Sequence, residues 1–166
     1  MPQAYNFEYV GTDNNEYAFV TTNELIYNIA FVKADFYFPE HLSFKQNIFE
    51  LIIQLDESQK NIRAVHDPKL PLTIATIFLD FFKSNERVVV FSCDTTDRRQ
   101  AVRNRKFDDW FKQSNNDTFI KLNEVIDDIE NETQYFMSMI LVNTNPLKDE
   151  IIVAFKELKE AIMDAK

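Results

Sequence analysis

The sequence contains a single glycine, Gly11, among its 166 residues. Phosphate-binding and dinucleotide-binding loops need two or more glycines at fixed spacing, because only glycine lets the backbone approach the phosphate groups closely. The nucleophile elbow of many hydrolases also needs a glycine on either side of its serine. The sequence therefore excludes all three of these motifs.

Cysteine and histidine are almost as scarce, with one cysteine, Cys93, and two histidines, His41 and His66. One cysteine rules out an internal disulfide bond, so nothing in the sequence indicates an oxidising compartment. The two histidines stand in separate segments, and no HExxH, CxxC or clustered His/Cys pattern for a metal site can be assembled. We therefore expect neither a metal ion nor a cofactor.

Long apolar runs are also missing, and none approaches the roughly 20 residues that a membrane-spanning helix needs. The N-terminal segment MPQAYNFEY lacks the charged stretch and the apolar run of a secretory signal. We therefore expect a cytoplasmic protein without a membrane partner. The net charge of −9 argues against broad non-specific binding of nucleic acid, because that affinity comes from many Lys and Arg side chains.

What the sequence does contain is the composition of a globular protein, with 45% apolar and 27% charged residues. At this length we expect one α+β domain that spans residues 1–166. Alternating apolar residues and short apolar runs predict strands. These strands are expected at residues 5–9, 16–22, 25–34, 47–57, 87–93, 118–126 and 134–142.

Three stretches have the apolar spacing of helices, over residues 71–84, 97–113 and 146–164. The first carries one polar stripe on an otherwise apolar surface, so we expect it to be buried in the domain or to meet a second chain. The first and third helices are thus the candidate surfaces for an oligomer. Because the strands come in runs rather than alternating with helices, the order favours an α+β fold with a mainly antiparallel sheet. The polar stripe of the first helix, over residues 71–84, consists of Thr73, Thr76, Asp80 and Lys83.

One segment reverses the acidic character of the chain, because residues 94–106 carry five positive side chains and two aspartates. Helical spacing places Arg103 on the same face as the aromatic residues Phe107, Trp110 and Phe111. We therefore expect Arg103 to be desolvated. An unpaired buried charge costs several kcal/mol, so its guanidinium needs an anion as a partner.

Three kinds of anion fit Arg103. An internal carboxylate, from Asp94, Asp80 or the acidic segment 127–130, would fix the helix against the sheet. A phosphate-bearing ligand or RNA would match the arginine fork and the free N–H groups at the start of the helix. An acidic surface of a partner protein is the third alternative. For an external anion or partner, the candidate binding residues are Asp94, Asp97, Arg99, Arg103 and Arg105.

Other side chains with reactive groups have more ordinary interpretations. We expect Cys93 to be a small buried residue rather than a reactive thiol. Asp97 stands three residues before Gln100, which resembles a capping box, so it is expected to start the helix rather than to hold a metal with Asp94. Because no catalytic constellation can be assembled, no catalytic residue is assigned and the sequence favours a protein that is not an enzyme.

The basic segment also carries a family resemblance. The run FSCDTTDRRQAVRNRKFDDWF, preceded by LTIATIFLDFFKSNERVVV and followed by LVNTNP, resembles an uncharacterised family of small proteins found mainly in Bacteroidetes. Its pattern is C-D-x-x-D-x-R-x-x-x-R-x-R, then an aromatic residue and W-F. This chain departs from the pattern at Arg98, where the resemblance implies a glycine. The resemblance implies a bacterial cytoplasmic protein and no particular activity.

Two hypotheses about function follow. The first is a non-enzymatic protein that binds another protein, such as an antitoxin, an immunity protein or a component of a defence system. It depends on the missing catalytic constellation, the acidic charge and the small size. The second is a phosphate-, nucleotide- or RNA-binding protein, or an RNA-acting enzyme, that uses the arginines of the helix over residues 97–113.

Overall fold

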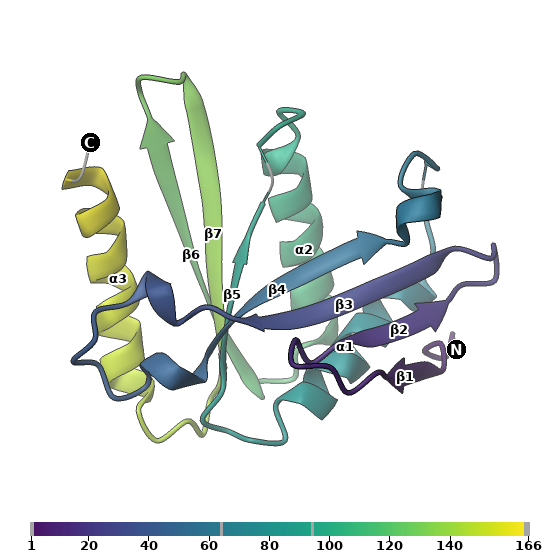
Figure 1. The fold of residues 1–166 in the computed structure, drawn as a ribbon, viewed down its shortest axis with the longest axis horizontal. Coiled ribbons are helices and arrows are strands. Elements are labelled where there is room, and N and C mark those ends of the chain that lie inside the picture. Colours follow the sequence, from purple (N-terminus) through teal and green to yellow (C-terminus); the bar gives the residue numbers. More distant parts are fainter. Residues whose placement is uncertain (1, 64, 94, 165–166) are drawn as a thin grey trace.

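The computed structural model describes residues 2–63, 65–93 and 95–164, and their side chains through Ile162. The described residues form one seven-stranded sheet and three α-helices (Figure 1), which confirms the α+β fold. The strands are β1 (Phe7–Tyr9), β2 (Tyr17–Val20), β3 (Ile26–Lys33), β4 (Ile48–Leu55), β5 (Val88–Ser92), β6 (Phe119–Asp128) and β7 (Thr133–Val142). The helices are α1 (Lys69–Phe81), α2 (Gln100–Ser114) and α3 (Lys148–Asp164), and three short 3-10 turns are η1 (Asp35–Tyr37), η2 (Lys45–Asn47) and η3 (Glu57–Gln59).

The strand order is β1-β2-β3-β4-β5-β7-β6. Within the described residues, β4 and β5 are the one parallel pair, and α1 makes the crossover that parallel neighbours need. Their pairing covers only the segments 48–50 and 88–90. Beyond these segments the two strands diverge, so that β4 and β5 form the arms of a V (Figure 1). This divergence opens the middle of the sheet at the carboxyl ends of both strands.

Two cores lie on opposite faces of the sheet, because successive side chains of a strand point to opposite sides. Helices α1 and α2 cover one face, where Phe31 of β3 stacks on Phe81 of α1 with the ring centroids 3.8 Å apart. Helix α3 covers the other face at β5, β6 and β7, where Met139 contacts Ile151 and its neighbours in a second apolar cluster. The sheet is therefore buried on both faces at β5 and β7 and at the start of β4, where Ile48 and Phe49 belong to opposite cores.

The N-terminal strands keep one face uncovered. In Figure 1, β2, β3 and β4 lie in front of α1, and in the described part of the chain no helix lies on their near side. Ile52 of β4 pairs with Ala30 of β3 on this face, and its side chain is 37% exposed. Val20 of β2 is 55% exposed. The uncovered face thus shows apolar side chains to the solvent.

Most predicted elements agree with the structure, but α2 begins later than predicted. The sequence predicts that this helix begins at Asp97 with a capping box, whereas the observed helix begins at Gln100 with Arg99 as its N-cap and no side-chain cap. Arg98 has a φ of 56°, in the left-handed region, and a helix cannot continue through that conformation. The capping role of Asp97 is therefore wrong.

The polar stripe of α1 lies against the N-terminal strands. Thr73 is fully buried, and its hydroxyl accepts a hydrogen bond from the backbone N–H of Tyr5 at 2.9 Å. The Tyr17 hydroxyl donates to the Asp80 carboxylate, also at 2.9 Å. Thr73 and Asp80 of the stripe therefore join α1 to the N-terminal segment and to β2, whereas Thr76 and Lys83 are exposed.

Candidate functional site

A crevice of about 700 Å³ lies where β4 and β5 diverge. Its walls come from β4, from the end of β5 and from α2, and η3 closes one end. In open sheets, ligands bind outside the carboxyl ends of parallel strands, and small-molecule sites are commonly of this size. The crevice is therefore the strongest candidate site of the fold.

One wall of the crevice is formed by α2. Arg103, Lys106, Phe107 and Trp110 line it, and their spacing of three and four residues places them along one face of the helix. The Lys106 ammonium lies 4.8 Å from the centroid of the Trp110 ring, within the range of a cation–π contact. This wall combines two positive side chains with an aromatic surface.

The opposite wall carries a carboxylate. Glu50 of β4 stands at the last paired position before the strands diverge, and its carboxylate accepts a hydrogen bond from the Tyr37 hydroxyl at 3.3 Å. The Ser92 hydroxyl is 3.5 Å from the same oxygen, a weak contact. Burial, and then the nearby Glu50 charge, raise the pKa of Tyr37 to about 12. The tyrosine therefore stays a hydrogen-bond donor to Glu50 at neutral pH.

Arg103 is paired inside its own chain. Its two terminal nitrogens donate to the two carboxylate oxygens of Asp97 at 2.7 and 2.6 Å, a bidentate pair. This pair lowers the pKa of Asp97 to about 2. The internal partners predicted from the sequence were Asp94, Asp80 and the acidic segment 127–130, and Asp97 was not among them. Asp94 lies outside the described residues.

The expected desolvation of Arg103 is wrong, because 41% of its side chain is exposed. The helix face was assigned correctly, since Phe107 is buried and Trp110 and Phe111 pack against the core. However, Arg103 stands one turn closer to the helix start, where the divergence of β4 and β5 leaves open space instead of sheet. The guanidinium therefore lines the crevice instead of the core.

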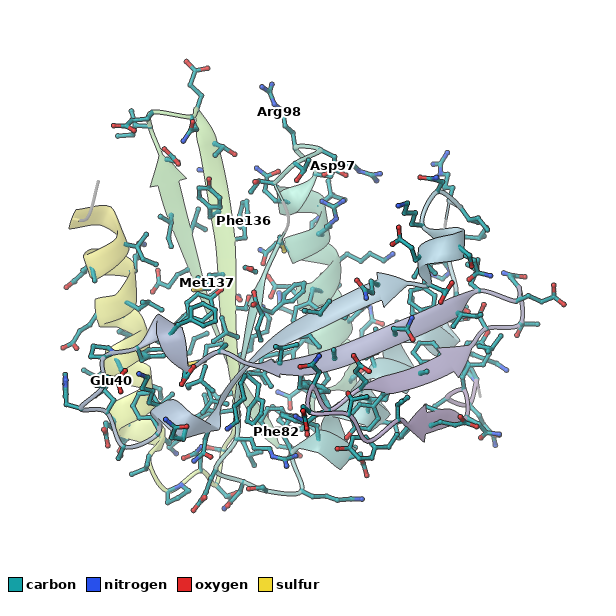
Figure 2. The ribbon with its side chains drawn as sticks, viewed as in Figure 1. Glu40, Phe82, Asp97, Arg98, Phe136 and Met137 are labelled. Carbon is teal, nitrogen blue, oxygen red and sulfur yellow. The ribbon has the colours of Figure 1, made fainter. Side chains whose placement is uncertain are left out.

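The remaining arginines of the basic segment do not line the crevice with Arg103. Arg99 and Arg105 are exposed and lie outside the set of residues that line the crevice. Arg98 points away from the body of the protein at the start of α2, beside Asp97 (Figure 2). The resemblance implies a glycine at this position, and the φ of 56° explains it, because glycine adopts this conformation without strain. Of the four predicted site residues that the structure describes, Arg103 and Asp97 form a pair, and Arg99 and Arg105 lie outside the crevice.

A buried polar network beneath α2 was missed by the sequence analysis. The Lys121 ammonium, with its side chain only 4% exposed, donates to Asp108 and Asn123, and to the Ser138 hydroxyl at 3.0 Å. Burial lowers the pKa of Lys121. The pair with Asp108 fastens α2 to β6. Strand alternation could have predicted that Lys121 is buried, because it lies two residues after Phe119 and so points to the same face of the sheet.

The other reactive side chains show no sign of a catalytic role. Burial raises the pKa of the Cys93 thiol, the opposite of the shift that a reactive thiolate needs. His41 and His66 are both exposed. Among the described residues, no three His, Cys, Asp or Glu side chains gather closely enough to hold a metal ion. The helices described are too short or too polar to cross a membrane.

Comparison with known protein families shows which family the chain belongs to. Residues 66–157 match the model described as "Family of unknown function (DUF6169)", and this match covers more than half of the sequence. The chain belongs to the DUF6169 family. The matched part of this DUF6169 protein runs from the loop before α1 into α3, and it includes the α2 wall of the crevice. No curated protein and no solved structure matches the chain significantly. Membership confirms an uncharacterised family and assigns no activity.

Proposed function

We propose that this protein binds a phosphate-bearing small molecule of the nucleotide type in the crevice between β4, β5 and α2. The observation that carries the proposal is the α2 wall, where Arg103, Lys106 and Trp110 face one cleft at the carboxyl ends of the parallel strands. Glu50 and Glu57 also line the crevice, so the attraction for an anion comes from the two positive side chains of the α2 wall, in a chain with a net charge of −9.

The chemistry of the two walls supports a ligand with several parts. Arg103 and Lys106 are donors of the kind that bind phosphate oxygens. The ring of Trp110 offers a flat surface on which a nucleobase stacks. Glu50, on the opposite wall, accepts hydrogen bonds from hydroxyl or amino groups. A nucleotide carries all three groups within one molecule.

Asp97 modifies the positive wall. Its carboxylate holds the Arg103 guanidinium in a fixed position, which favours a preorganised site. The same carboxylate offsets part of the arginine charge, so a phosphate group competes with it. Lys106 therefore contributes more than Arg103 to the attraction of this wall for an anion, although the sequence did not predict Lys106 as a site residue.

Calorimetric titration of the full chain with pyrophosphate, ATP and a short single-stranded RNA tests the proposal. We expect ATP and pyrophosphate to bind. Either Lys106→Ala or Arg103→Ala should lower the affinity for each ligand by about 10-fold or more, because a hydrogen bond to a charged group is lost. Arg105→Ala is the matched control, because it removes a charge from the same helix outside the crevice. The absence of binding, or an equal loss in the control, contradicts the proposal; RNA binding without nucleotide binding favours an RNA ligand.

We place this function in the cytoplasm of a bacterium. The resemblance to small Bacteroidetes proteins supports this setting, and so does the single cysteine, because proteins of oxidising compartments commonly use disulfide pairs. Fractionation of the native host, followed by detection of the untagged protein, tests the location. Recovery in a membrane or secreted fraction would contradict it.

A partner protein is the second candidate, and the uncovered face of β2, β3 and β4 favours it. Val20, paired with Ile26 of β3, and Ile52, paired with Ala30 of β3, are exposed on this face, and exposed apolar side chains commonly mark interaction sites. The pair of changes Val20→Lys and Ala30→Lys tests this surface in affinity capture from the native host, because neither residue lines the crevice. A partner that is captured by the native chain and by the double variant alike does not use this face.

A further inference from the structure

A second hollow lies further along α2, between this helix and α1. Its volume is about 140 Å³, and it is separate from the crevice, although Phe107 and Trp110 line both. The apolar part of its wall comes mainly from the two helices, with Phe119 at the start of β6. Ser114, Asn115 and Asn116 stand at the end of α2 beside it. We call it the α1–α2 cavity.

The α1–α2 cavity is not an ordinary packing gap. Protein interiors are packed as densely as organic crystals, and voids larger than a water molecule are few. The rings of Phe78 and Phe111 reach its wall without filling it. The exposed residues Leu79 and Asn116 also line it, so the space opens to solvent between the two helices and is not a sealed void.

The chemistry of the wall selects an apolar occupant. Among the described residues that line the cavity, none is charged, whereas the crevice has charged residues on both of its walls. Ser114, Asn115, Asn116 and Thr118 line one side of the cavity and offer water polar partners, whereas the aromatic and aliphatic remainder of the wall offers none and favours an apolar occupant. A protein cavity of about 150 Å³ lined by apolar side chains binds benzene, which gives the scale.

We propose that the α1–α2 cavity binds a free small apolar molecule of about six to eight carbon atoms, with an aromatic ring or a branched aliphatic chain. Ala75 of α1 is the smallest side chain in the apolar wall, and it leaves the space that the occupant fills. The proposal does not depend on the function proposed for the crevice, because the two hollows differ in charge and in position.

Titration of the full chain with benzene and p-xylene tests the proposal. Trp110 is the single tryptophan of the chain and lines the cavity, so its fluorescence emission reports occupancy directly. We expect a saturable change in emission and a rise of a few degrees in Tm at saturating p-xylene, because a ligand that binds only the folded state stabilises it. Ala75→Leu fills the cavity, and we expect at least a 10-fold loss of affinity.

Ala101→Leu is the matched control, because it adds the same isobutyl group to an exposed position of α2 away from the cavity. If Ala75→Leu fails to fold, Ala75→Ser replaces it. That change keeps the size and adds a hydroxyl group to the apolar wall, so p-xylene is expected to bind several-fold more weakly.

Three results would overturn the proposal. The first is no saturable binding of either hydrocarbon by the unmodified chain. The second is equal binding by the unmodified chain and Ala75→Leu, or an equal loss in Ala101→Leu. The third is a Trp110 emission that changes with protein concentration alone, because a second copy of the chain would then insert a side chain into the cavity.

Discussion

The crevice and the α1–α2 cavity both lie along α2 and share Phe107 and Trp110, yet they differ in charge, volume and expected ligand. The crevice faces the gap between two diverging strands and carries Arg103 and Lys106. The cavity faces a second helix, and no charged residue is found in the described part of its wall. The difference shows that position along a helix, and not only the face of the helix, decides the environment of a side chain.

The neighbouring elements explain this difference. The first turns of α2 lie over the end of β5, where β4 has moved away and water reaches the helix face. The later turns lie against α1, where Ile74 and Phe78 exclude water. The same stripe of residues therefore lines a polar site at one end and an apolar site at the other.

The largest expected effect is that of breaking the wall that both hollows share. Phe107 is 6% exposed and lies 4.4 Å from Phe91 between ring centroids. We expect Phe107→Ala to lower the free energy of unfolding by about 3–5 kcal/mol, because it removes a buried ring and joins the two spaces. Urea unfolding measures the change. Val102→Ala, at an exposed position of α2, should change the free energy of unfolding by no more than about 0.5 kcal/mol. A loss below about 1 kcal/mol for Phe107→Ala would show that the shared wall contributes little to stability.

The next effect concerns the polar anchor that fixes the same helix. Asp108→Ala leaves the buried Lys121 charge without its carboxylate, and we expect a loss of about 3 kcal/mol of unfolding free energy near pH 7. The neighbouring change Asp109→Ala, at an exposed position, is the control.

The pH dependence of Asp108→Ala provides a second check. Burial lowers the pKa of Lys121 in the folded state, and removal of Asp108 lowers it further. Between this lowered pKa and the usual value of 10.5 the unfolded state binds more protons, so the stability of the variant should recover as the pH rises through that interval. A deficit that stays constant with pH would assign the loss to packing instead of charge.

A smaller effect separates the aromatic from the charged part of the crevice. Trp110→Leu removes the stacking surface and keeps an apolar side chain, so ATP should bind about 10-fold more weakly, the usual value for one stacked base. Pyrophosphate has no ring, and its affinity should not change. Calorimetry of both ligands measures the difference, and an equal loss for the two would mean that the whole wall has moved.

The smallest effect concerns the pair of Asp97 with Arg103. The pKa of Asp97 is lowered from 3.8 to about 2, so the pair stabilises the folded state above pH 3.8, and this contribution is lost as the pH falls toward 2. Asp97→Asn should therefore flatten the fall in Tm over this interval. It should also raise the affinity for pyrophosphate a few-fold at neutral pH, because one competing charge is gone. An unchanged affinity would mean that Arg103 does not face the ligand.

Much of the fold follows from local pattern. The period of two in β4 and the continuous apolar run of β5 predicted strands close to their observed bounds. The aromatic stripe of α2 predicted its buried face. Helix ends were less predictable, because Arg98 adopts a left-handed backbone conformation that is uncommon for arginine and that the sequence does not indicate.

The candidate site was only partly predictable. The sequence identified Arg103 as the arginine that differs from its neighbours, and the structure places it in the crevice. Its carboxylate partner was missed, because Asp97 was assigned to a helix cap. Lys106 was passed over, and so was Trp110 as part of a ligand wall, because neither residue is unusual until its surroundings are known.

The sequence by itself determined the order of strands and helices, the amphipathic face of α2 and the exclusion of glycine-dependent phosphate loops. These properties are local, since a period of two or 3.6 residues sets which side chains share a face. Only the tertiary structure decided that β4 and β5 diverge, that Lys121 is buried beneath α2, and that one helix lines two different hollows. Those features depend on strand pairing and helix packing between residues far apart in the chain, and no local pattern specifies where such elements meet.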